Sequence, residues 1–383
     1  MKLIPFLFII LSQNAFAYFD TGTGADGACT QATLIAGTRT YNCTTLNIGA
    51  ANSVFNAVGG AAVVIKVQGA VTISNTLSAN GGVGANADGT GSLAGGLAGA
   101  GGSNGGAYGA LDTDGQNGNG TGGGVKGIYV NDVSNAFDVY GGGGGGGSYS
   151  TQGGTLALNG DINGTSQAGT KGAQGPTWGN ETNFESSFIG GSGGASGGGG
   201  ETTGGVKVSG STGGGGGGAI HIIAGGDITI SGSVVANGGN GGGDGASVES
   251  GGGAGSGGAI WLQSEGNIII SGSLTATGGT GGANGSFGTS GEGGSGGSGR
   301  IRLDDIDGVI TGGGTVSPSA QVNSLATIIA RNSSSSVELS SDISCAAREK
   351  LSWSHVVTFL LGGLILVSFK FKRAERFLAT EKF

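Results

Sequence analysis

Apolar and polar residues alternate at every second position in several short stretches of the chain. The clearest stretch spans 227–236, where the apolar side chains from Ile228 to Ala236 share one face. A period of two is that of a β-strand. Ser231-Gly232-Ser233 interrupts the stretch and predicts a bend between two short strands.

These stretches recur along the chain. Residues 219–242 and 259–282 are identical at 13 of 24 positions at a spacing of 40, and six of the identities are glycine. Residues 62–82 align without a gap 157 positions upstream of the first copy, and a further unit begins at 299–303. Because one such unit cannot bury its apolar face alone, stacked units are expected to share one column of Ile, Val, Leu and Ala. The predicted fold is all-β, a glycine-rich parallel β-solenoid resembling a β-helix.

The spacing of 157 is close to four units of about 40, so degenerate units are expected in between. Candidate openings are Gly106-Ala107-Tyr108 and 155–158. The repeat region as a whole is assigned to 61–317, after an N-terminal cap at 18–60. A Ser-rich stalk, low in apolar residues, follows at 318–352.

Glycine makes up 95 of the 383 residues, with runs such as 141–147 and 213–218. Glycine loses more backbone entropy on ordering than other residues, so these runs order only if they are packed. They form either extended layers of the polyproline II type between coils or mobile loops on one face. Partial order is expected for the runs that enter each unit, and mobility for 83–124 and 165–205.

Both ends of the chain carry membrane signals. Residues 1–17 contain Lys2, an apolar run and Ala15-Phe16-Ala17, which is the order of a secretory signal peptide. Residues 353–369 are uncharged and predict one C-terminal transmembrane helix, and the basic tail at 370–383 is expected to be cytoplasmic. The predicted location is the cell envelope, as a single-pass membrane protein whose body lies outside the cytoplasm. Removal of the tail and processing to the cell surface remain open.

Charge limits the choice of partners. Residues 18–369 contain 10 basic and 22 acidic residues, a net charge of −12. An acidic surface repels phosphates, so nucleic acid is excluded as an expected partner. The expected partners are the membrane, through the C-terminal helix, and surface glycans or other envelope proteins.

Three cysteines fit an oxidising compartment. Cys29 and Cys43 enclose a short segment in which a disulfide would stabilise the fold, by about 3 kcal/mol from loop-closure entropy. Two unpaired buried thiols are the alternative. Cys345 is left over, and its role is open: free, intermolecular or a processing site.

Few residues offer chemistry. His221 and Trp261 occupy equivalent outward positions in the two clear repeats, and on stacked coils they could form a surface patch that contacts sugars. Asp112-Thr113-Asp114-Gly115 and the group Asp304, Asp305 and Asp307 lack the ligand order of a calcium loop and are read as turn residues. No catalytic residue, metal site or cofactor is therefore assigned.

Two resemblances follow from these motifs. The strings GGAI at 217–220 and 257–260, the segment that follows each, and GGSGRI at 296–301 resemble bacterial glycine-rich β-helix surface proteins, some of them adhesin-like. Cys345, the apolar helix and the basic cluster from Lys370 to Arg373 are similar to the C-terminal sorting or anchor tails of envelope proteins. The resemblance implies an extended surface role and transfers no catalytic residue.

The expected function is that of a non-enzymatic, membrane-anchored protein of the cell surface or envelope, structural or adhesin-like. Two alternatives stay open: a carbohydrate-active β-helix enzyme, and a largely disordered acidic envelope linker. The enzyme would need clustered acids, for which Asp227 is a candidate, and the linker predicts no sheet outside the two clear repeats.

Overall fold

The computed structural model describes residues 18–35, 40–49, 53–54, 60–89, 91–130, 140–153, 169–179, 184–185, 187–202, 204–243, 250–283 and 291–328. The chain divides into two compact units, 1–328 and 329–383. The expected signal peptide, transmembrane helix, basic tail and Cys345 lie outside the described residues. Among the residues that are described, no helix is long and apolar enough to cross a membrane.

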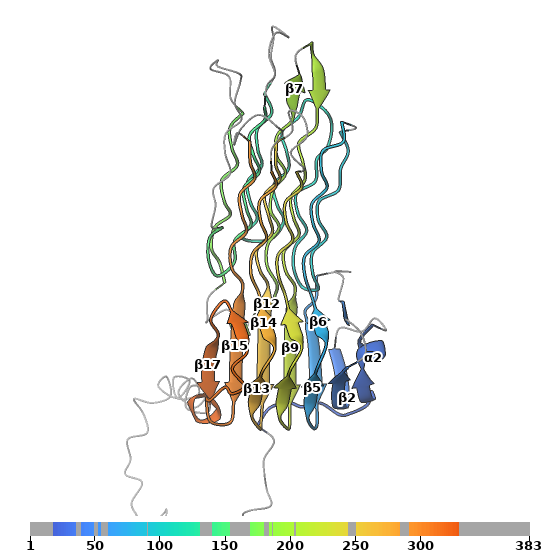
Figure 1. Ribbon diagram of the computed structural model, residues 1–383, viewed down its shortest axis with the longest axis vertical. Coiled ribbons are helices and arrows are strands. Elements are labelled where there is room, and N and C mark those ends of the chain that lie inside the picture. The colour runs from blue at the N-terminus through green and yellow to red at the C-terminus, as the bar shows by residue number, and fades with distance from the viewer. Residues whose placement is uncertain are drawn as a thin grey trace, which may run out of the picture. The chain divides into compact units, whose positions relative to one another are not determined.

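The described part of the first unit is built from short strands (Figure 1). The strands are β1 (Gly27–Thr30), β2 (Thr40–Ile48), β3 (Ser53–Val54), β4 (Val63–Val67), β5 (Val71–Ile73), β6 (Thr76–Ser78), β7 (Gly200–Thr202), β8 (Val206–Val208), β9 (Ala219–Ala224), β10 (Ile228–Ile230), β11 (Ser233–Val235), β12 (Ala259–Ser264), β13 (Ile268–Ile270), β14 (Ser273–Thr275), β15 (Arg300–Asp305), β16 (Thr315–Ser317) and β17 (Gln321–Ser324). One short helix, α2 (Gln31–Ile35), follows β1.

Strands of successive repeats pair in parallel and in register. Ile220 of β9 lies opposite Ile260 of β12, at the spacing of 40 residues. It also lies opposite Val63 of β4, at the spacing of 157, and Ile260 lies opposite Ile301 of β15. The repeats read from the sequence are therefore neighbouring turns of one stack, and the all-β, parallel architecture is confirmed.

Each full turn contributes three strands. The first two lie in one curled sheet of order β13-β10-β5-β2-β4-β9-β12-β15-β17, and the third lies in a second sheet of order β16-β14-β11-β6-β3. Strand β2 joins both halves of the first sheet because it pairs with β4 through Thr40–Cys43 and with β5 through Leu46–Ile48. We call these strands, without β7 and β8, the strand base.

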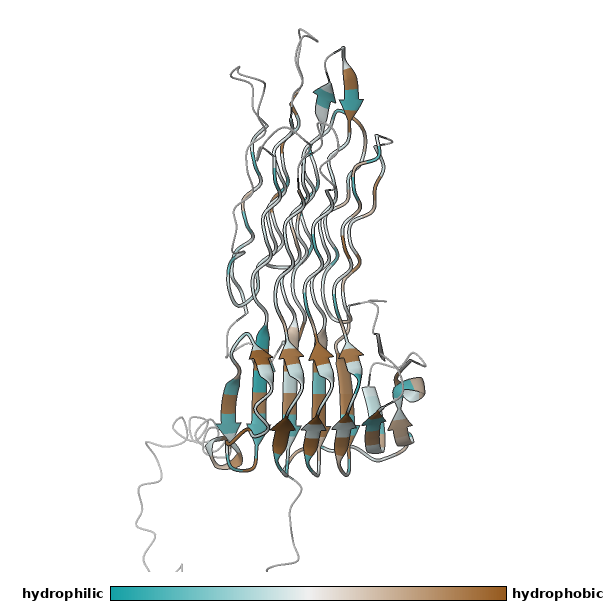
Figure 2. Ribbon diagram, in the orientation of Figure 1, coloured by the Kyte–Doolittle hydropathy of each residue, from teal (hydrophilic) through white to brown (hydrophobic). Residues whose placement is uncertain are grey.

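The core of the strand base is the predicted apolar column. Ile228, Ile230, Val234 and Ala236 are fully buried, as are their equivalents in the neighbouring turns. Apolar residues concentrate in these strands, whereas the segments beyond them are of intermediate hydropathy (Figure 2). The strand period in the sequence thus identified the core.

Strands also occur outside the expected repeat region at both ends of the stack. Strands β2 and β3, within the segment 18–60 that was expected to cap the repeats, pair with β4, β5 and β6 as an atypical first turn. Strand β17 pairs with β15, so residues 321–324 belong to the last turn and not to a stalk. The alternative of a largely disordered linker predicts sheet only in the two clear repeats, and the strands at both ends of the stack contradict it.

Beyond the strand base, glycine-rich segments run side by side as an ordered assembly, which we call the glycine bundle (Figure 1). Its principal segments lie within 79–89, 91–130, 140–153, 169–175, 190–199, 209–218, 236–243, 250–258, 276–283 and 291–299. Within a segment, every third residue bonds to the same neighbour: Gly213 and Gly216 donate to the carbonyls of Gly106 and Ser103. Three residues per turn is the period of an extended polyproline II helix.

Residues 213–218, in the interior of the bundle, form backbone hydrogen bonds with neighbours on every side. The N–H groups of 213–218 donate in rotation to three segments, and its carbonyls accept from three others. The six are 79–82, 103–106, 253–256, 96–99, 191–194 and 239–242. A Cβ atom added at any glycine from Gly213 to Gly218 would lie less than 3.0 Å from backbone atoms of a neighbour. Glycine is therefore required by the close approach of six backbones.

The expected mobility of 83–124 and 165–205 is wrong for the described residues. Gly99, Gly118 and Gly193 in these ranges hydrogen-bond through their backbones and have no room for a Cβ atom. The degenerate unit at Gly106-Ala107-Tyr108 is also wrong, because those residues lie in the glycine bundle, and β4 pairs directly with β9. The unit expected at 155–158 lies outside the described residues.

Segments at the edge of the bundle show a sequence period of three. Asn80, Val83 and Asn86 are exposed at every third position, with small residues between them. At 169–175 the proportions are the opposite: one residue in three is a buried glycine, and the two residues between successive glycines are larger and partly or fully exposed. The number of glycines per triplet thus reflects how many neighbours surround a segment.

Candidate functional site

His221 and Trp261 lie side by side on β9 and β12, opposite one another in the register. Their rings stack, with centroids 4.2 Å apart and planes 3° apart. On the next strand, β15, the guanidinium carbon of Arg302 lies 4.7 Å from the centroid of the Trp261 ring. One row of outward side chains therefore carries an imidazole, an indole and a guanidinium in contact.

This row is covered and is not an open patch. The Phe188 ring lies 5.5 Å from His221 and 5.9 Å from Trp261, and the Phe184 ring lies 5.6 Å from Trp261. Trp261 is only 8% exposed. The outward direction was correctly expected, but the apolar rings from 184–188 bury the indole face that would have contacted a sugar.

Packing also fixes the protonation of His221. Its Nε2 atom lies 2.7 Å from Oε1 of Gln263, in the next outward row on β12. Burial lowers the pKa of the imidazole from 6.5 to about 4, against the smaller upward effect of the Gln263 hydrogen bond. The ring is therefore neutral at pH 7.

Asp304 is the centre of this second row. Its carboxylate is fully buried and accepts hydrogen bonds from four side chains. The donors are Trp261 Nε1 at 2.7 Å, Gln263 Nε2 at 3.2 Å, Arg302 Nε at 2.9 Å and Asn323 Nδ2 at 2.7 Å. A carboxylate so fully engaged stabilises the packing of β12, β15 and β17, and its oxygens are not free to act as a base.

Arg302 connects the two rows to a cavity. Its side chain is 3% exposed, and Nη1 donates to Glu185 Oε1 at 2.7 Å. Burial is the largest single effect on the pKa of Arg302 and lowers it, but the hydrogen bonds and charges of Asp304 and Glu185 together outweigh burial and raise the pKa. A cavity of about 200 Å³ lies beside this residue. It is lined by Ser150, Phe184, Gly299, Arg300, Ile301, Arg302, Pro318, Ser319 and Gln321.

Sequence reasoning missed this cavity. The arginines of the GRIRL string at 299–303 were read only as the start of a last repeat. A signal was present, because Arg300 and Arg302 replace Ala259 and Trp261 at equivalent positions. A pair of cations on one face of a strand, in an otherwise acidic body, marks a departure from the structural repeat.

Asp112 and Asp307 lie in turns or bends, as expected, whereas Asp304 and Asp305 belong to strand β15 and are fully buried, so the turn assignment is wrong for those two. In 112–115, Lys207 pairs with Asp112 and Lys126 with Asp114, the latter at 2.9 Å. Asp307 accepts from the N–H of Val309 at 2.8 Å, and Asp227 accepts from the N–H of Asn267 at 2.8 Å. Within the described residues, no three His, Cys, Asp or Glu side chains converge as metal ligands would.

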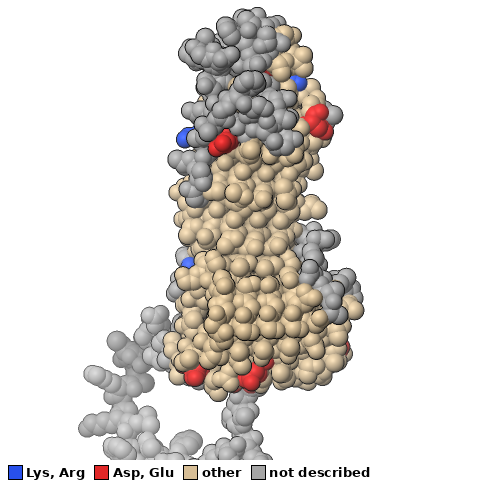
Figure 3. Space-filling view, in the orientation of Figure 1, with Lys and Arg blue, Asp and Glu red and all other residues tan. Residues whose placement is uncertain are grey.

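The charges of one face gather away from the middle of the glycine bundle. Figure 3 shows acidic side chains near the strand base and near the far end of the bundle, with a largely uncharged surface between them. On this face, therefore, few charged groups lie along the middle of the bundle.

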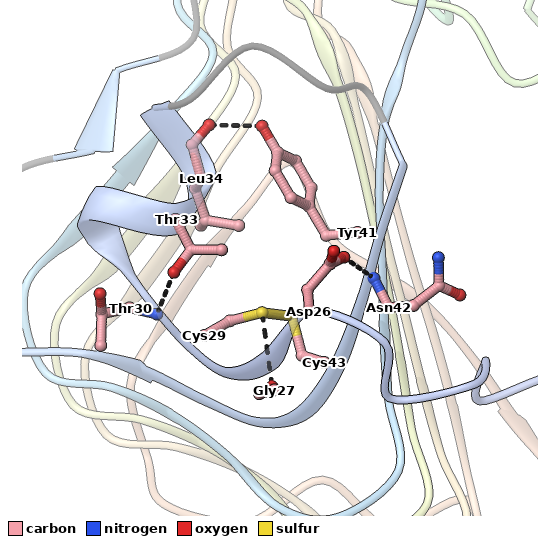
Figure 4. Close-up of a disulfide and its surroundings, with 9 residues drawn as sticks. All are labelled: Asp26, Gly27, Cys29, Thr30, Thr33, Leu34, Tyr41, Asn42 and Cys43. Atoms are coloured by element: carbon pink, nitrogen blue, oxygen red, sulfur yellow. Dashed lines mark hydrogen bonds between the residues drawn. A yellow bond between two sulfur atoms is a disulfide. The ribbon is translucent and has the colours of Figure 1, made fainter.

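The two N-terminal cysteines form a disulfide (Figure 4). Cys29 on β1 and Cys43 on β2 have Cα atoms 5.5 Å apart, and both side chains are buried. Tyr41 donates its hydroxyl to the carbonyl of Leu34 in α2, and Asp26 accepts from the N–H of Asn42 at 2.6 Å. These contacts fix α2 and β1 against the first turn.

Comparison of the chain with protein-family models, with curated proteins and with solved structures gives no match.

Proposed function

We propose that the protein is a non-enzymatic, adhesin-like or structural protein of the cell envelope. In this proposal the first unit is a β-solenoid carrying a glycine bundle, and the helix at 353–369 anchors it in the membrane. The body lies outside the cytoplasm, where the Cys29–Cys43 disulfide persists.

The observation that carries the proposal is the glycine bundle. Its interior consists of backbones in mutual hydrogen bonds, with no space for side chains at the interior glycines. Such an interior leaves no room for catalytic side chains at these glycines, but it holds the ends of neighbouring segments at fixed separations. The far end of the bundle is where 236–243 passes into 250–258 and 276–283 into 291–299. The intervening sequences, 244–249 and 284–290, are thus candidates for contact with a partner.

The acids that could support an enzyme have structural roles instead. Asp304 is buried among four donors, and Asp227 caps the N–H of Asn267 at a turn. Glu185 pairs with Arg302. These assignments favour binding over hydrolysis as the function of the described part.

The test is surface labelling of intact cells that produce the full chain. An epitope inserted at 244–249 should be labelled without permeabilisation, and an epitope after Phe383 only with it. Labelling of the first epitope only in permeabilised cells would contradict the envelope location. Hydrolysis of a polysaccharide by the purified chain, lost in Asp227→Asn, would contradict the non-enzymatic assignment.

A further inference from the structure

The cavity beside β15 has the features of a binding site. It lies where the first residues of β15 meet Ser150 of the glycine bundle, Phe184 of the covering segment and Pro318 to Gln321 of the last turn. Its wall thus combines guanidinium, amide and hydroxyl groups with apolar atoms of Phe184, Ile301 and Pro318. Pockets that bind small molecules have this mixture of apolar wall and a few placed polar groups.

Arg302, one of the residues that line this cavity, also has an unsatisfied donor. Its Nε and Nη1 atoms are used by Asp304 and Glu185, and its plane lies on Trp261. Its Nη2 atom is buried and has no hydrogen-bond partner among the described residues. A buried donor without an acceptor costs about 1–3 kcal/mol, so an acceptor that reached this atom would be favoured.

Arg300 is the second guanidinium at this cavity. Arg302 pairs with two carboxylates, Asp304 at 2.9 Å and Glu185 at 2.7 Å, so these two arginines and two carboxylates together carry no net charge. Arg300, two residues earlier on the same side of β15, lines the same cavity and forms no ion pair with any described residue. Two guanidinium groups on one wall, one of them unpaired, select an anion.

The volume and the apolar wall narrow the class of anion. A cavity of about 200 Å³ holds one small molecule and not an oligosaccharide. The side chains of Phe184 and Pro318 are apolar and cannot hydrogen-bond to a fully polar ion, but they can pack against the carbon face of a sugar ring. Ser319 and Gln321 can hydrogen-bond to its hydroxyl groups.

We propose that this cavity binds a small sugar carboxylate, such as one uronic acid unit, with its carboxylate between Arg300 and Arg302. The site does not depend on where the protein resides or on the loops at the far end of the bundle. Its failure would therefore leave the proposed function untouched, and failure of the surface labelling would leave the site untouched.

The experiment is calorimetric titration of the purified full chain with glucuronate, glucose, acetate and inorganic phosphate. Glucuronate should bind saturably and at least about tenfold more tightly than the other three, because only glucuronate combines the carboxylate with the ring. Arg300→Gln should weaken glucuronate binding about tenfold or more. Lys66→Gln is the matched control, since Lys66 lies on β4 of the same sheet and pairs with Asp20 away from the cavity; binding should be unchanged.

Three results would overturn the proposal. The first is that glucuronate does not bind saturably to protein whose circular dichroism shows that it is folded. The unsatisfied donor of Arg302 would then have no ligand from this class. Another is equal affinity for glucose, which would remove the carboxylate from the interaction. The third is phosphate binding as tightly as glucuronate, which would remove the sugar ring.

Discussion

At the scale of single residues, the glycine bundle is a set of positions at which only hydrogen fits. Glycine is elsewhere a source of flexibility, but at Gly215 a Cβ atom would lie less than 3.0 Å from backbone atoms of Leu97 and Gly96. The entropy lost on ordering such a residue is offset by backbone hydrogen bonds that a larger residue would prevent. A high glycine content in these segments therefore indicates close backbone packing and not flexibility.

We expect Gly215→Ala to destabilise the protein by about 1–3 kcal/mol, because the added methyl group forces neighbouring backbones apart. Gly109→Ala is the matched control. At Gly109 the nearest atom to an added Cβ is Gln116 Nε2 at an ordinary 3.7 Å, so this change should be neutral or slightly stabilising. Chemical denaturation of both variants measures the difference. Equal stability of the two would contradict the close packing around Gly215.

Asparagines on the edge segments complete the backbone hydrogen bonding. Oδ1 of Asn80 accepts from the N–H of Asn237 at 2.8 Å, and Oδ1 of Asn86 accepts from the N–H of Gly243 at 2.9 Å. Val83 occupies the position between them and offers no acceptor. The N–H of Asn240, which faces it in the next segment, has no hydrogen-bond partner among the described residues.

Val83→Asn should therefore stabilise the protein by about 0.5–1 kcal/mol by supplying the missing acceptor. Val83→Ala is the control, since it removes an exposed side chain without adding an acceptor and should change stability by less than about 0.5 kcal/mol. Thermal unfolding followed by circular dichroism distinguishes them. A gain in both variants would show that loss of an exposed valine, and not the hydrogen bond, is responsible.

His221 makes stability depend on pH. Its folded pKa of about 4 lies below the ordinary value of 6.5, so the unfolded chain binds the proton first as the pH falls. The free energy of unfolding should consequently decrease between pH 6.5 and 4, by about 3 kcal/mol at most. His221→Phe keeps a ring against Trp261 and cannot be protonated.

The measurement is the difference in unfolding free energy between the wild type and His221→Phe as a function of pH, which cancels the carboxylates common to both. The wild type should lose stability relative to the variant below pH 6.5. A difference that stays constant from pH 7 to 4 would mean that the imidazole is not buried in the neutral form.

At the scale of elements, the sequence predicted the strands well and the glycine segments poorly. The alternation from Ile228 to Ala236 and the spacings of 40 and 157 gave the strands, their register and the core. The same spacing misled at Gly106-Ala107-Tyr108, because a further strand-bearing unit was expected there. In the structure those residues lie in the glycine bundle, while β4 and β9 pair directly.

The missed signal is the period of three. Asn80, Val83 and Asn86, and likewise Gly169, Gly172 and Gly175, recur at the step of a threefold helix. Which neighbours surround a segment could not be read from one sequence, since six partners far apart in the chain meet around 213–218. For the same reason, the pairing of His221 with Trp261 was predictable, but their cover by Phe184 and Phe188 was not.

The disulfide stabilises the first, atypical turn. Its two cysteines lie 14 residues apart in sequence, and Cys29→Ser with Cys43→Ser should lower stability by about 3 kcal/mol. The double variant should be insensitive to reductant, whereas reduction of the wild type should reproduce its loss. Denaturant titration with and without dithiothreitol checks this expectation. Reductant that shifts both proteins equally would place the effect elsewhere in the chain.

At the scale of the whole described unit, the strand base and the glycine bundle are continuous. The third strand of a turn passes into a bundle segment, and a bundle segment leads into the first strand of the next turn, as β11 passes into 236–243 and 250–258 passes into β12. The two parts therefore share chain direction, register and repeat. We expect them to unfold in one transition, since loss of the base would release the segments that hold the bundle together.

Hydrogen exchange followed by mass spectrometry tests the central claim most directly, which is that the glycine segments form an ordered, backbone-bonded bundle. Peptides covering 213–218 and 250–258 should be protected to an extent comparable with those covering β9 and β12, because their N–H groups donate to neighbouring segments. Exchange of 213–218 and 250–258 at the rate of an unstructured chain, with β9 and β12 still protected, would contradict the bundle.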